Sequence, residues 1–333
     1  MINKVQIEHF KDIEKETLEL KPLTVITGVN SAGKSAAIQS ILAVLKKADV
    51  KGDFLLGQYD FSFKGAVCKY GAYDEFKILL ETDEGNYTLN VNSEKEELNP
   101  AKLALGLEKN AFYLSANRKG YDTFEQRSTD YAVGVQGEYL FDALFKAKDE
   151  LIALDLKADG ERETLGGQVD AWLNEILGMK FKVNTEERNQ SIIVSYDTDE
   201  LKGLMPNQLG TAVSYLSKVL IMCLHAKPDD LLMIENPEIH LHPKAQAKLG
   251  EFLTVIADAG VQLIVETHSE HVINKIQYQI YSGKYDTEKL AIYYKGNPRE
   301  QFEKVVIDEH GRYIVDFPEG FFDASLDDLI EIG

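Results

Sequence analysis

The stretch Val25-Ile-Thr-Gly-Val-Asn-Ser-Ala-Gly-Lys-Ser35 decides the fold of the first part of the chain. A short apolar run breaks into the pattern Gly28-x-x-x-x-Gly33-Lys34-Ser35 and then continues as a helical pattern, which is the setting of a phosphate-binding P-loop. The glycines permit a tight turn, and backbone N–H groups and the helix N-terminus attract an anion. The stretch therefore predicts a nucleoside triphosphate site.

Each position of this loop has an expected task. Lys34 reaches the β- and γ-phosphates, and the hydroxyl of Ser35 is a ligand of Mg²⁺. The residues expected to bind the nucleotide in this loop are Asn30, Gly33, Lys34, Ser35 and Ala36. The expected cofactors are ATP and Mg²⁺.

The composition is typical of a soluble enzyme. The chain has 333 residues, 44% of them hydrophobic, and is long enough to bury a large core. No apolar run approaches the roughly 20 residues of a membrane span, and the first residues read as a strand. Cys68 and Cys223 do not form spaced pairs, which favours a reducing compartment. We expect a cytoplasmic protein that does not enter a membrane.

The formal net charge is −19, and it is unevenly distributed. Residues 1–120 hold 16 basic and 17 acidic side chains, residues 121–200 hold 8 and 18, and residues 201–333 hold 12 and 20. Proteins bind phosphate backbones through a local excess of Lys and Arg. The charge therefore argues against a general affinity for nucleic acid, and any nucleic-acid face belongs to the first third.

Hydrophobic periodicity predicts an α/β chain without internal repeats or linkers. Helices are expected near residues 34–47, 207–225, 243–259 and 269–281, with further helical periodicity between Gln136 and Leu177. Strands are expected near residues 2–9, 16–20, 23–28, 76–82, 86–92, 111–115, 179–184, 191–196, 231–235, 261–266, 290–294 and 302–308.

The chain offers no clear place to divide it, so we expect one composite domain over residues 1–333. Within it we distinguish a β-rich N-terminal lobe with the P-loop over 1–120 and a helical insertion over 121–190. A third lobe with further motifs covers 191–290, and a small C-terminal β module with an acidic tail covers 291–333.

Two later strands end in polar side chains. Leu231-Leu-Met-Ile-Glu235 is a buried-strand run that ends in a carboxylate, from which an acid can reach Mg²⁺ at the carboxyl edge of a parallel sheet. The strand that starts at Val261 runs into His268 at the same edge. The expected metal ligands are therefore Ser35 and Glu235, and three strand ends are expected to converge on one phosphate.

Three segments resemble the motifs of ABC-type ATPases. Ile234-Glu-Asn-Pro-Glu-Ile-His-Leu-His-Pro243 is similar to the Walker B motif with its D-loop, and Val265-Glu-Thr-His-Ser-Glu-His271 is similar to the H-loop. Asn207-Gln-Leu-Gly-Thr-Ala-Val-Ser214 is similar to the signature segment.

The resemblance is strongest to the OLD-like group, near the SMC and RecF proteins. Ile7-Glu-His-Phe-Lys-Asp-Ile13, Lys21-Pro-Leu-Thr-Val-Ile-Thr-Gly28 and Phe112-Tyr-Leu-Ser-Ala-Asn-Arg118 look like that group. Phe317-Pro-Glu-Gly-Phe-Phe-Asp323 resembles a C-terminal module of unknown function in stand-alone members, which often occur in bacterial anti-phage loci.

The resemblance implies an ABC-type P-loop ATPase head that works as a homodimer or higher homo-oligomer, with each nucleotide held between two heads. Gly210, Ala212 and Ser214 would face the γ-phosphate bound by the partner head. His268 would contact the γ-phosphate or the attacking water, and Lys11 would contact phosphate near the P-loop.

The Walker B motif departs from the common Asp-Glu-Pro wording, because this chain reads Glu235-Asn-Pro-Glu238. Glu235 then lies on the Mg²⁺ side. An amide cannot accept a proton as a carboxylate does, so either Asn236 positions the water and turnover is slow, or Glu238 approaches the water in its place. The residues expected in catalysis are Glu235, Asn236, Glu238 and His268.

These features favour an ATP-driven dimeric switch, the ATPase component of a bacterial defence system that controls a separate effector such as a nuclease. Two alternatives stay open, an ATP-bound scaffold with negligible hydrolysis and a RecF-like DNA-repair clamp. The histidines at 240, 242, 268 and 271 could also be imagined as a metal cluster. Arg118 is either an exposed surface cation or a functional contact.

Overall fold

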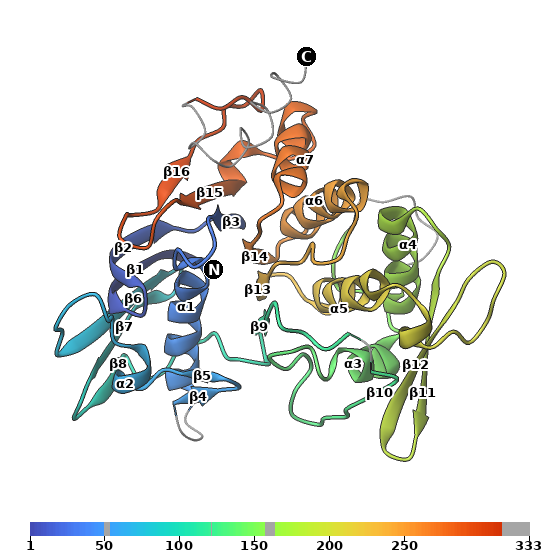
Figure 1. The fold of residues 1–333 in the computed structure, drawn as a ribbon, viewed down its shortest axis with the longest axis horizontal. Helices are drawn as coiled ribbons and strands as arrows, with labels where there is room; N and C mark the ends of the chain where they lie inside the picture. Colours follow the sequence, from blue (N-terminus) through green and yellow to red (C-terminus); the bar gives the residue numbers. More distant parts are fainter. Residues whose placement is uncertain (50–53, 121, 157–163, 315–333) are drawn as a thin grey trace. The chain divides into compact units, whose positions relative to one another are not determined.

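The computed structural model describes residues 1–49, 54–120, 122–156 and 164–314 (Figure 1). The chain folds into two compact units. Unit 1 comprises Met1–Gly106 and the chain from Glu266 onward, and unit 2 comprises Leu107–Val265. The segment Phe317–Asp323 lies outside the described residues, and so does part of the expected helical insertion. The expectation of one composite domain stays a prediction.

Unit 1 begins with an antiparallel sheet made of β1 (Ile2–Phe10), β2 (Ile13–Glu19), β6 (Glu75–Thr82), β7 (Gly85–Asn92) and β8 (Glu96–Asn99). The strand order is β2-β1-β6-β7-β8. Alternate side chains of a strand share one face, and here that face is buried. Val5 and Ile7 of β1 pair with Leu80 and Ile78 of β6, and all four are at most 1% exposed.

The P-loop strand of unit 1 is β3 (Leu23–Gly28), and all six of its residues are buried. It leads through the loop into helix α1 (Lys34–Ala48), which packs on β1 and β6. The strand β15 (Leu290–Lys295) pairs in parallel with β3 along its whole length, and β16 (Glu303–Val305) pairs antiparallel with β15. The strand expected at the start of a separate C-terminal β module therefore belongs to the sheet of the P-loop strand, because both strands are buried and each supplies backbone partners to the other.

Shorter elements complete unit 1. They are β4 (Leu55–Leu56), β5 (Tyr59–Asp60), α2 (Phe63–Ala66), α7 (Glu270–Tyr281) and the 3₁₀ turn η2 (Thr287–Lys289). The side chain of Ser269 caps α7 by accepting a hydrogen bond from the N–H of Val272.

Unit 2 has a parallel core. The strand β13 (Leu231–Glu235) pairs in parallel with β9 (Ala111–Leu114). The strand β14 (Gln262–Glu266) lies on the other side of β13, and its last residue, Glu266, is the first residue of the second part of unit 1. Two long helices follow its motif segments, α5 (Thr211–His225) after the 3₁₀ turn η1 (Pro206–Gln208), and α6 (Pro243–Asp258) after β13.

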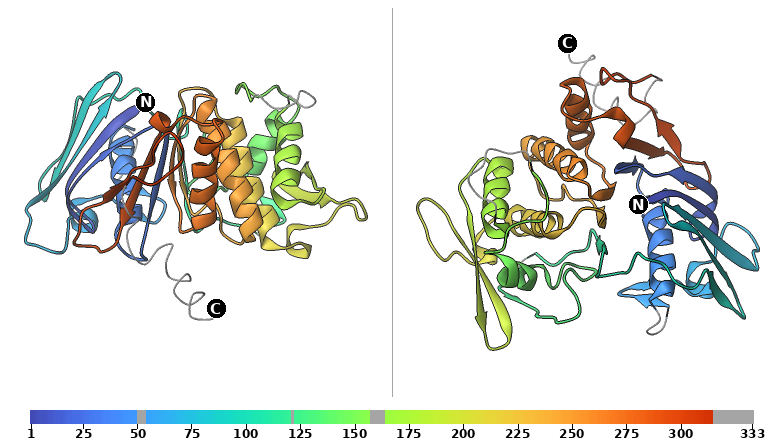
Figure 2. Two further views of the ribbon diagram at one scale, coloured as in Figure 1. Left: turned by 90° about the horizontal axis from the view of Figure 1, so that it is seen from above. Right: turned by 180° about the vertical axis from the view of Figure 1, so that it is seen from behind.

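The expected helical insertion is built into unit 2. It contains the helices α3 (Leu140–Ala147) and α4 (Leu165–Leu177), and also two strands, β10 (Phe124–Glu125) and β11 (Lys182–Arg188). Both pair antiparallel with β12 (Ser191–Asp197). Helix α4 lies beside α5 and α6 (Figure 2), where Trp172 meets Phe252 edge to face at 4.9 Å.

Candidate nucleotide-binding site

The loop between β3 and α1 leaves its backbone accessible. Val29, Asn30 and Ser31 are exposed, and α1 begins directly after Gly33, whose φ is +97° and which provides no side-chain cap. A Cβ at Gly28, where φ is +133°, would lie 2.1 Å from the carbonyl oxygen of Lys295. Only glycine permits this approach. A loop of exposed backbone at an uncapped helix N-terminus fits a phosphate group.

Lys34 is buried within this loop, with 3% of its surface exposed. Its ammonium group donates a 2.6 Å hydrogen bond to the carbonyl of Val29. Burial lowers the pKa of Lys34, and the nearby negative charge of Glu266 opposes that shift. The ammonium group of Lys34 is therefore held inside the P-loop, where it is expected to bind phosphate.

Ser35 meets a carboxylate that the sequence did not single out. Its hydroxyl donates a 2.7 Å hydrogen bond to Oε2 of Glu266, the last residue of β14. Glu266 is 5% exposed. Its place at the end of a buried strand, two residues before His268, is the one sequence signal that could have drawn attention to it.

His268 lies beside the P-loop within unit 1. It shares a hydrogen bond with the backbone of Gly28. Partial burial and the charge of Lys34 lower the pKa of His268, which favours a neutral ring. The preceding Thr267 donates its N–H to the carbonyl of Ile26 at 3.0 Å, so this segment is fixed against β3.

Lys11 points to α1. Its ammonium group donates a 2.6 Å hydrogen bond to Oε1 of Gln39 and lies 5.4 Å from the ring centroids of Tyr59 and Phe61. Ala36 lies in the first turn of α1 and is 4% exposed. Because alanine has no polar side-chain atom, only its backbone N–H could contact a phosphate. The phosphate contacts expected of Lys11, Asn30 and Ala36 stay predictions.

The Walker B acid belongs to unit 2 and has its own partners there. Oε1 of Glu235 accepts a 2.8 Å hydrogen bond from the hydroxyl of Tyr113, and Oε2 accepts a 3.2 Å bond from the N–H of Ala116. Glu235 is 5% exposed. Strand β9 and the residues directly after it thus orient this carboxylate.

Arg118 is 2% exposed, so the interpretation as an exposed surface cation is wrong. Its guanidinium donates to the carbonyl of Glu235 at 2.9 Å and to the carbonyl of Asn236. It lies 5.7 Å from the ring centroid of Tyr215 on α5. Burial lowers the pKa of Arg118 to about 10, and the negative charge of Glu238 opposes this shift. A charged side chain can be buried here because backbone carbonyls accept hydrogen bonds from it.

The residues after Glu235 form a tight turn. Asn236 has a φ of +44°, a left-handed conformation that asparagine tolerates better than most residues. Glu238 is 7% exposed. His240 and His242 are exposed. The rings of His240 and Tyr215 pack edge to face, with their centroids 5.0 Å apart. Within the part of the chain that the structure describes, no group of three or more His, Cys, Asp or Glu side chains is arranged to hold a metal ion.

The signature segment exposes the start of α5. Gly210, the N-cap residue, is exposed, and Thr211 and Ala212 are half-buried. Ser214 lies one turn further and is 1% exposed, beside Tyr196. Its hydroxyl is therefore buried within unit 2. The contacts expected of Gly210, Ala212 and Ser214 with a nucleotide stay predictions.

The predicted site residues thus form two groups. Lys34, Ser35 and His268 are brought together in unit 1, and Glu235 to Glu238 lie in unit 2 with the signature segment. The convergence of three strand ends on one phosphate stays a prediction. No helix in the described ranges is long and apolar enough to cross a membrane.

Solved SMC head structures share the fold. One, an Smc head domain with an extended coiled coil from Pyrococcus furiosus, is 13% identical with a TM-score of 0.54, and the match covers 99% of both chains. A second, described as the SmcHead bound to the C-winged helix domain of ScpA, is 14% identical with a TM-score of 0.53 and covers 92% of this chain and 98% of that one. The chain therefore has the mixed α/β fold of an SMC-type ATPase head.

A sequence relative and a family also match. The Old nuclease of Escherichia phage P2 is 37% identical over 57 residues, which is 15% of this chain and 10% of that protein. Residues 23–274 match the family described as "AAA domain, putative AbiEii toxin, Type IV TA system". That range contains the P-loop, the Walker B strand and His268. Membership of this family implies binding of ATP and Mg²⁺. The match covers more than half of the chain, which therefore belongs to this AAA-domain family of P-loop ATPases.

Proposed function

We propose that the protein is an ATP-driven conformational switch, in which Mg²⁺ and ATP hold two heads together and hydrolysis releases them. The observation that carries the proposal is the built P-loop of unit 1, where Lys34, Ser35 and His268 lie around one exposed backbone loop. A switch of this kind is reset when its ligand is hydrolysed, and ATP bound at the P-loop would be that ligand.

The residues around the loop have distinct tasks in this proposal. Bound Mg·ATP supplies the phosphoanhydride bond whose hydrolysis resets the switch. Lys34 would exchange the carbonyl of Val29 for phosphate oxygens, and the hydroxyl of Ser35 would hold the metal. The ring of His268, whose lowered pKa favours the neutral form, would hydrogen-bond the terminal phosphate or the attacking water. Glu235, at the Walker B position, would be the acid on the metal side.

The start of α5 supports a dimer. Gly210 and Thr211 leave the helix N-terminus accessible, and such a terminus attracts an anion through its unpaired N–H groups. In the proposed dimer this terminus meets the nucleotide bound by the other copy, so neither head has a complete site alone.

We further propose a separate effector, with a nuclease as the first candidate, in a bacterial defence system. The family description and the short likeness to a phage nuclease support this role. The net charge of −19 argues against a chain that grips nucleic acid by itself.

A scaffold with negligible hydrolysis is the second candidate, and Asn236 favours it. This residue replaces the common water-activating carboxylate, and Arg118 binds its carbonyl. In that case ATP would stabilise the dimer without being consumed. Single-turnover hydrolysis separates the two functions.

Association in solution tests the switch. Light scattering should show ATP with Mg²⁺ raising the mass of the Glu235→Gln variant to a dimer or beyond, because slowed hydrolysis preserves the closed state. Thr211→Arg should abolish the increase by placing a bulky cation at the helix start, whereas Thr185→Arg on β11 should retain it. An ATP-independent mass in every variant would refute the proposal.

A further inference from the structure

The hydrogen bond between Ser35 and Glu266 joins residues that are 231 positions apart. Ser35 is the second residue of α1 and provides the hydroxyl expected at the metal. Glu266 ends β14 and is nine-tenths or more buried. The distance of 2.7 Å is that of a direct O–H···O bond to a carboxylate.

A hydroxyl that ligates a cation must turn a lone pair to the metal and its proton away from it. An acceptor on the far side of the hydroxyl fixes that orientation, and a carboxylate is the strongest acceptor among side chains. Glu266 already occupies this place relative to Ser35. Its charge also adds to the attraction of a hard divalent cation.

The position of Glu266 is fixed. Thr267, its neighbour, is bonded through its backbone to Ile26 of β3 at 3.0 Å. The ammonium group of Lys34 is close enough to interact with its charge. A buried carboxylate without such neighbours would be costly, so the pairing with Lys34 and Ser35 makes its burial tolerable.

Glu235 has partners of its own in unit 2. Its two oxygens accept hydrogen bonds from Tyr113 and from the backbone of Ala116. The carboxylate that accepts the hydrogen bond of the P-loop hydroxyl in unit 1 is Glu266.

We propose that Glu266 is a positioning residue of the Mg²⁺ site, which orients the hydroxyl of Ser35 toward the metal and holds metal-bound water through its carboxylate. The inference deepens the proposed function, because it rests on Mg·ATP binding at the P-loop. It assigns the chain a metal-side carboxylate in addition to Glu235.

The test is the affinity for a fluorescent ATP analogue, measured with Mg²⁺ and with EDTA for the wild type and Glu266→Gln. The amide retains the shape and an acceptor oxygen but lacks the charge. With EDTA the variant should bind at least as tightly as the wild type, because a negative charge near the phosphates is removed. With Mg²⁺ it should need about tenfold more metal for half-maximal binding.

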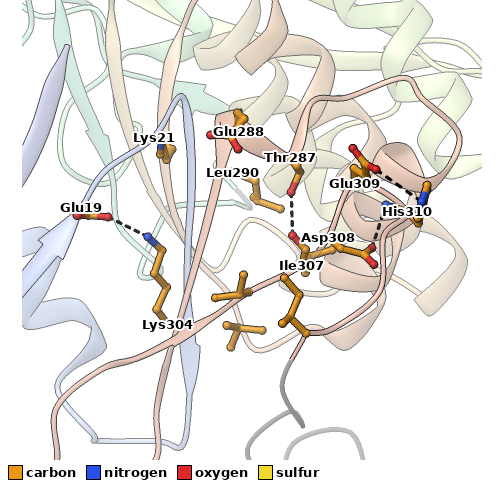
Figure 3. A pocket seen from close by; sticks show the side chains of 13 residues that line it. Glu19, Lys21, Thr287, Glu288, Leu290, Lys304, Ile307, Asp308, Glu309 and His310 are labelled. Carbon is orange, nitrogen blue, oxygen red and sulfur yellow. Dashed lines mark hydrogen bonds and ion pairs between the residues drawn. The ribbon is translucent and has the colours of Figure 1, made fainter.

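These opposite effects separate a metal role from a folding defect, which would weaken binding under both conditions. A matched control is Glu19→Gln, since Glu19 is an exposed carboxylate of unit 1 that pairs with Lys304 at 2.9 Å in a surface pocket (Figure 3). Its metal requirement should equal that of the wild type. If Glu266→Gln does not fold, Glu266→Asp retains the charge but withdraws the carboxylate, and it should still raise the metal requirement.

A double-mutant cycle tests the route through Ser35. Ser35→Ala alone should raise the metal concentration needed for half-maximal binding. Glu266→Gln should then add a smaller increase in the Ser35→Ala background than it causes in the wild type. An unchanged metal requirement in both Glu266 variants would overturn the inference while leaving nucleotide binding intact. A wild type that fails to bind the analogue in Mg²⁺ would overturn the inference together with the proposed function.

Discussion

Glu266 of unit 1 and Glu235 of unit 2 are both buried carboxylates at the end of a strand, but they have different hydrogen-bond partners. In unit 1, Glu266 is bonded to the P-loop hydroxyl itself, through Ser35. In unit 2, Glu235 is bonded to Tyr113 and Ala116, which belong to its own unit. Both are 5% exposed, so burial does not distinguish them.

The difference shows that the place of a residue in a sequence motif does not by itself determine which groups it contacts in the structure. Glu235 stands at the Walker B position, and its carboxylate is oriented by Tyr113 of β9 and by Ala116 after that strand. Glu266 stands in the H-loop segment, where the sequence assigned it no role, and it contacts the loop that defines the site.

Lys34→Ala should have the largest effect, because it removes the cation that is buried in the P-loop and interacts with the charge of Glu266. We expect ATP affinity to fall by about 100-fold or more, as a charge-assisted contact of roughly 3 kcal/mol is lost. Calorimetric titration measures this. Lys46→Ala, in the same helix, is the control, and an equal fall in both variants would count against the P-loop assignment.

Glu235→Gln tests the carboxylate of unit 2. Hydrolysis should slow by roughly 100-fold while ATP still binds, because the acid acts on the metal side and not on the phosphate. Phosphate release measures the rate, with Glu186→Gln on β11 as the control. An unchanged rate would leave Glu266 as the only carboxylate of the pair with a role in the reaction.

Arg118→Ala should destabilise unit 2 by about 2 kcal/mol, because the carbonyls of Glu235 and Asn236 lose a buried donor. Urea unfolding measures the loss. The neighbouring Lys119 is exposed, and Lys119→Ala should leave the free energy of unfolding within about 0.5 kcal/mol of the wild type. Equal stability of the two variants would mean that Arg118 does not hold this turn.

Asn236→Glu should have the smallest effect on stability, a loss of about 1 kcal/mol, since glutamate tolerates a φ of +44° less well than asparagine. Asn189→Glu, at φ +50° in an exposed turn, should cost a similar amount. Only the first variant should change the hydrolysis rate. A rise would show that Asn236 restrains turnover, and no change would show that Glu238 or His268 already orients the water.

The regular elements could be predicted because periodicity is local. The strand at 231–235 and the helix at 34–47 match β13 and α1 closely. The two-residue strands β4 and β5 have no period to detect, and β10 is equally short. Strand β15 was predicted, but its pairing with β3 depends on residues 267 positions earlier in the chain.

From the sequence, only site residues that belong to a recognisable motif could be named. The roles expected of Lys34, Ser35 and Glu235 come from sequence motifs and stay predictions, whereas the contact of Ser35 with Glu266 is visible only in three dimensions. Burial of Arg118 runs against the usual exposure of arginine, and the inward direction of Ser214 depends on how α5 packs. These are tertiary properties that a pattern of residue types does not contain.

Single-turnover hydrolysis of ATP by the purified chain with Mg²⁺ is the most direct test of the switch. The account predicts slow but complete conversion of bound ATP, at a rate below the roughly 10 s⁻¹ of a median enzyme. That conversion should be lost in Lys34→Ala and slowed in Glu235→Gln. Bound ATP that stays intact in the wild type would contradict the switch and establish the scaffold in its place.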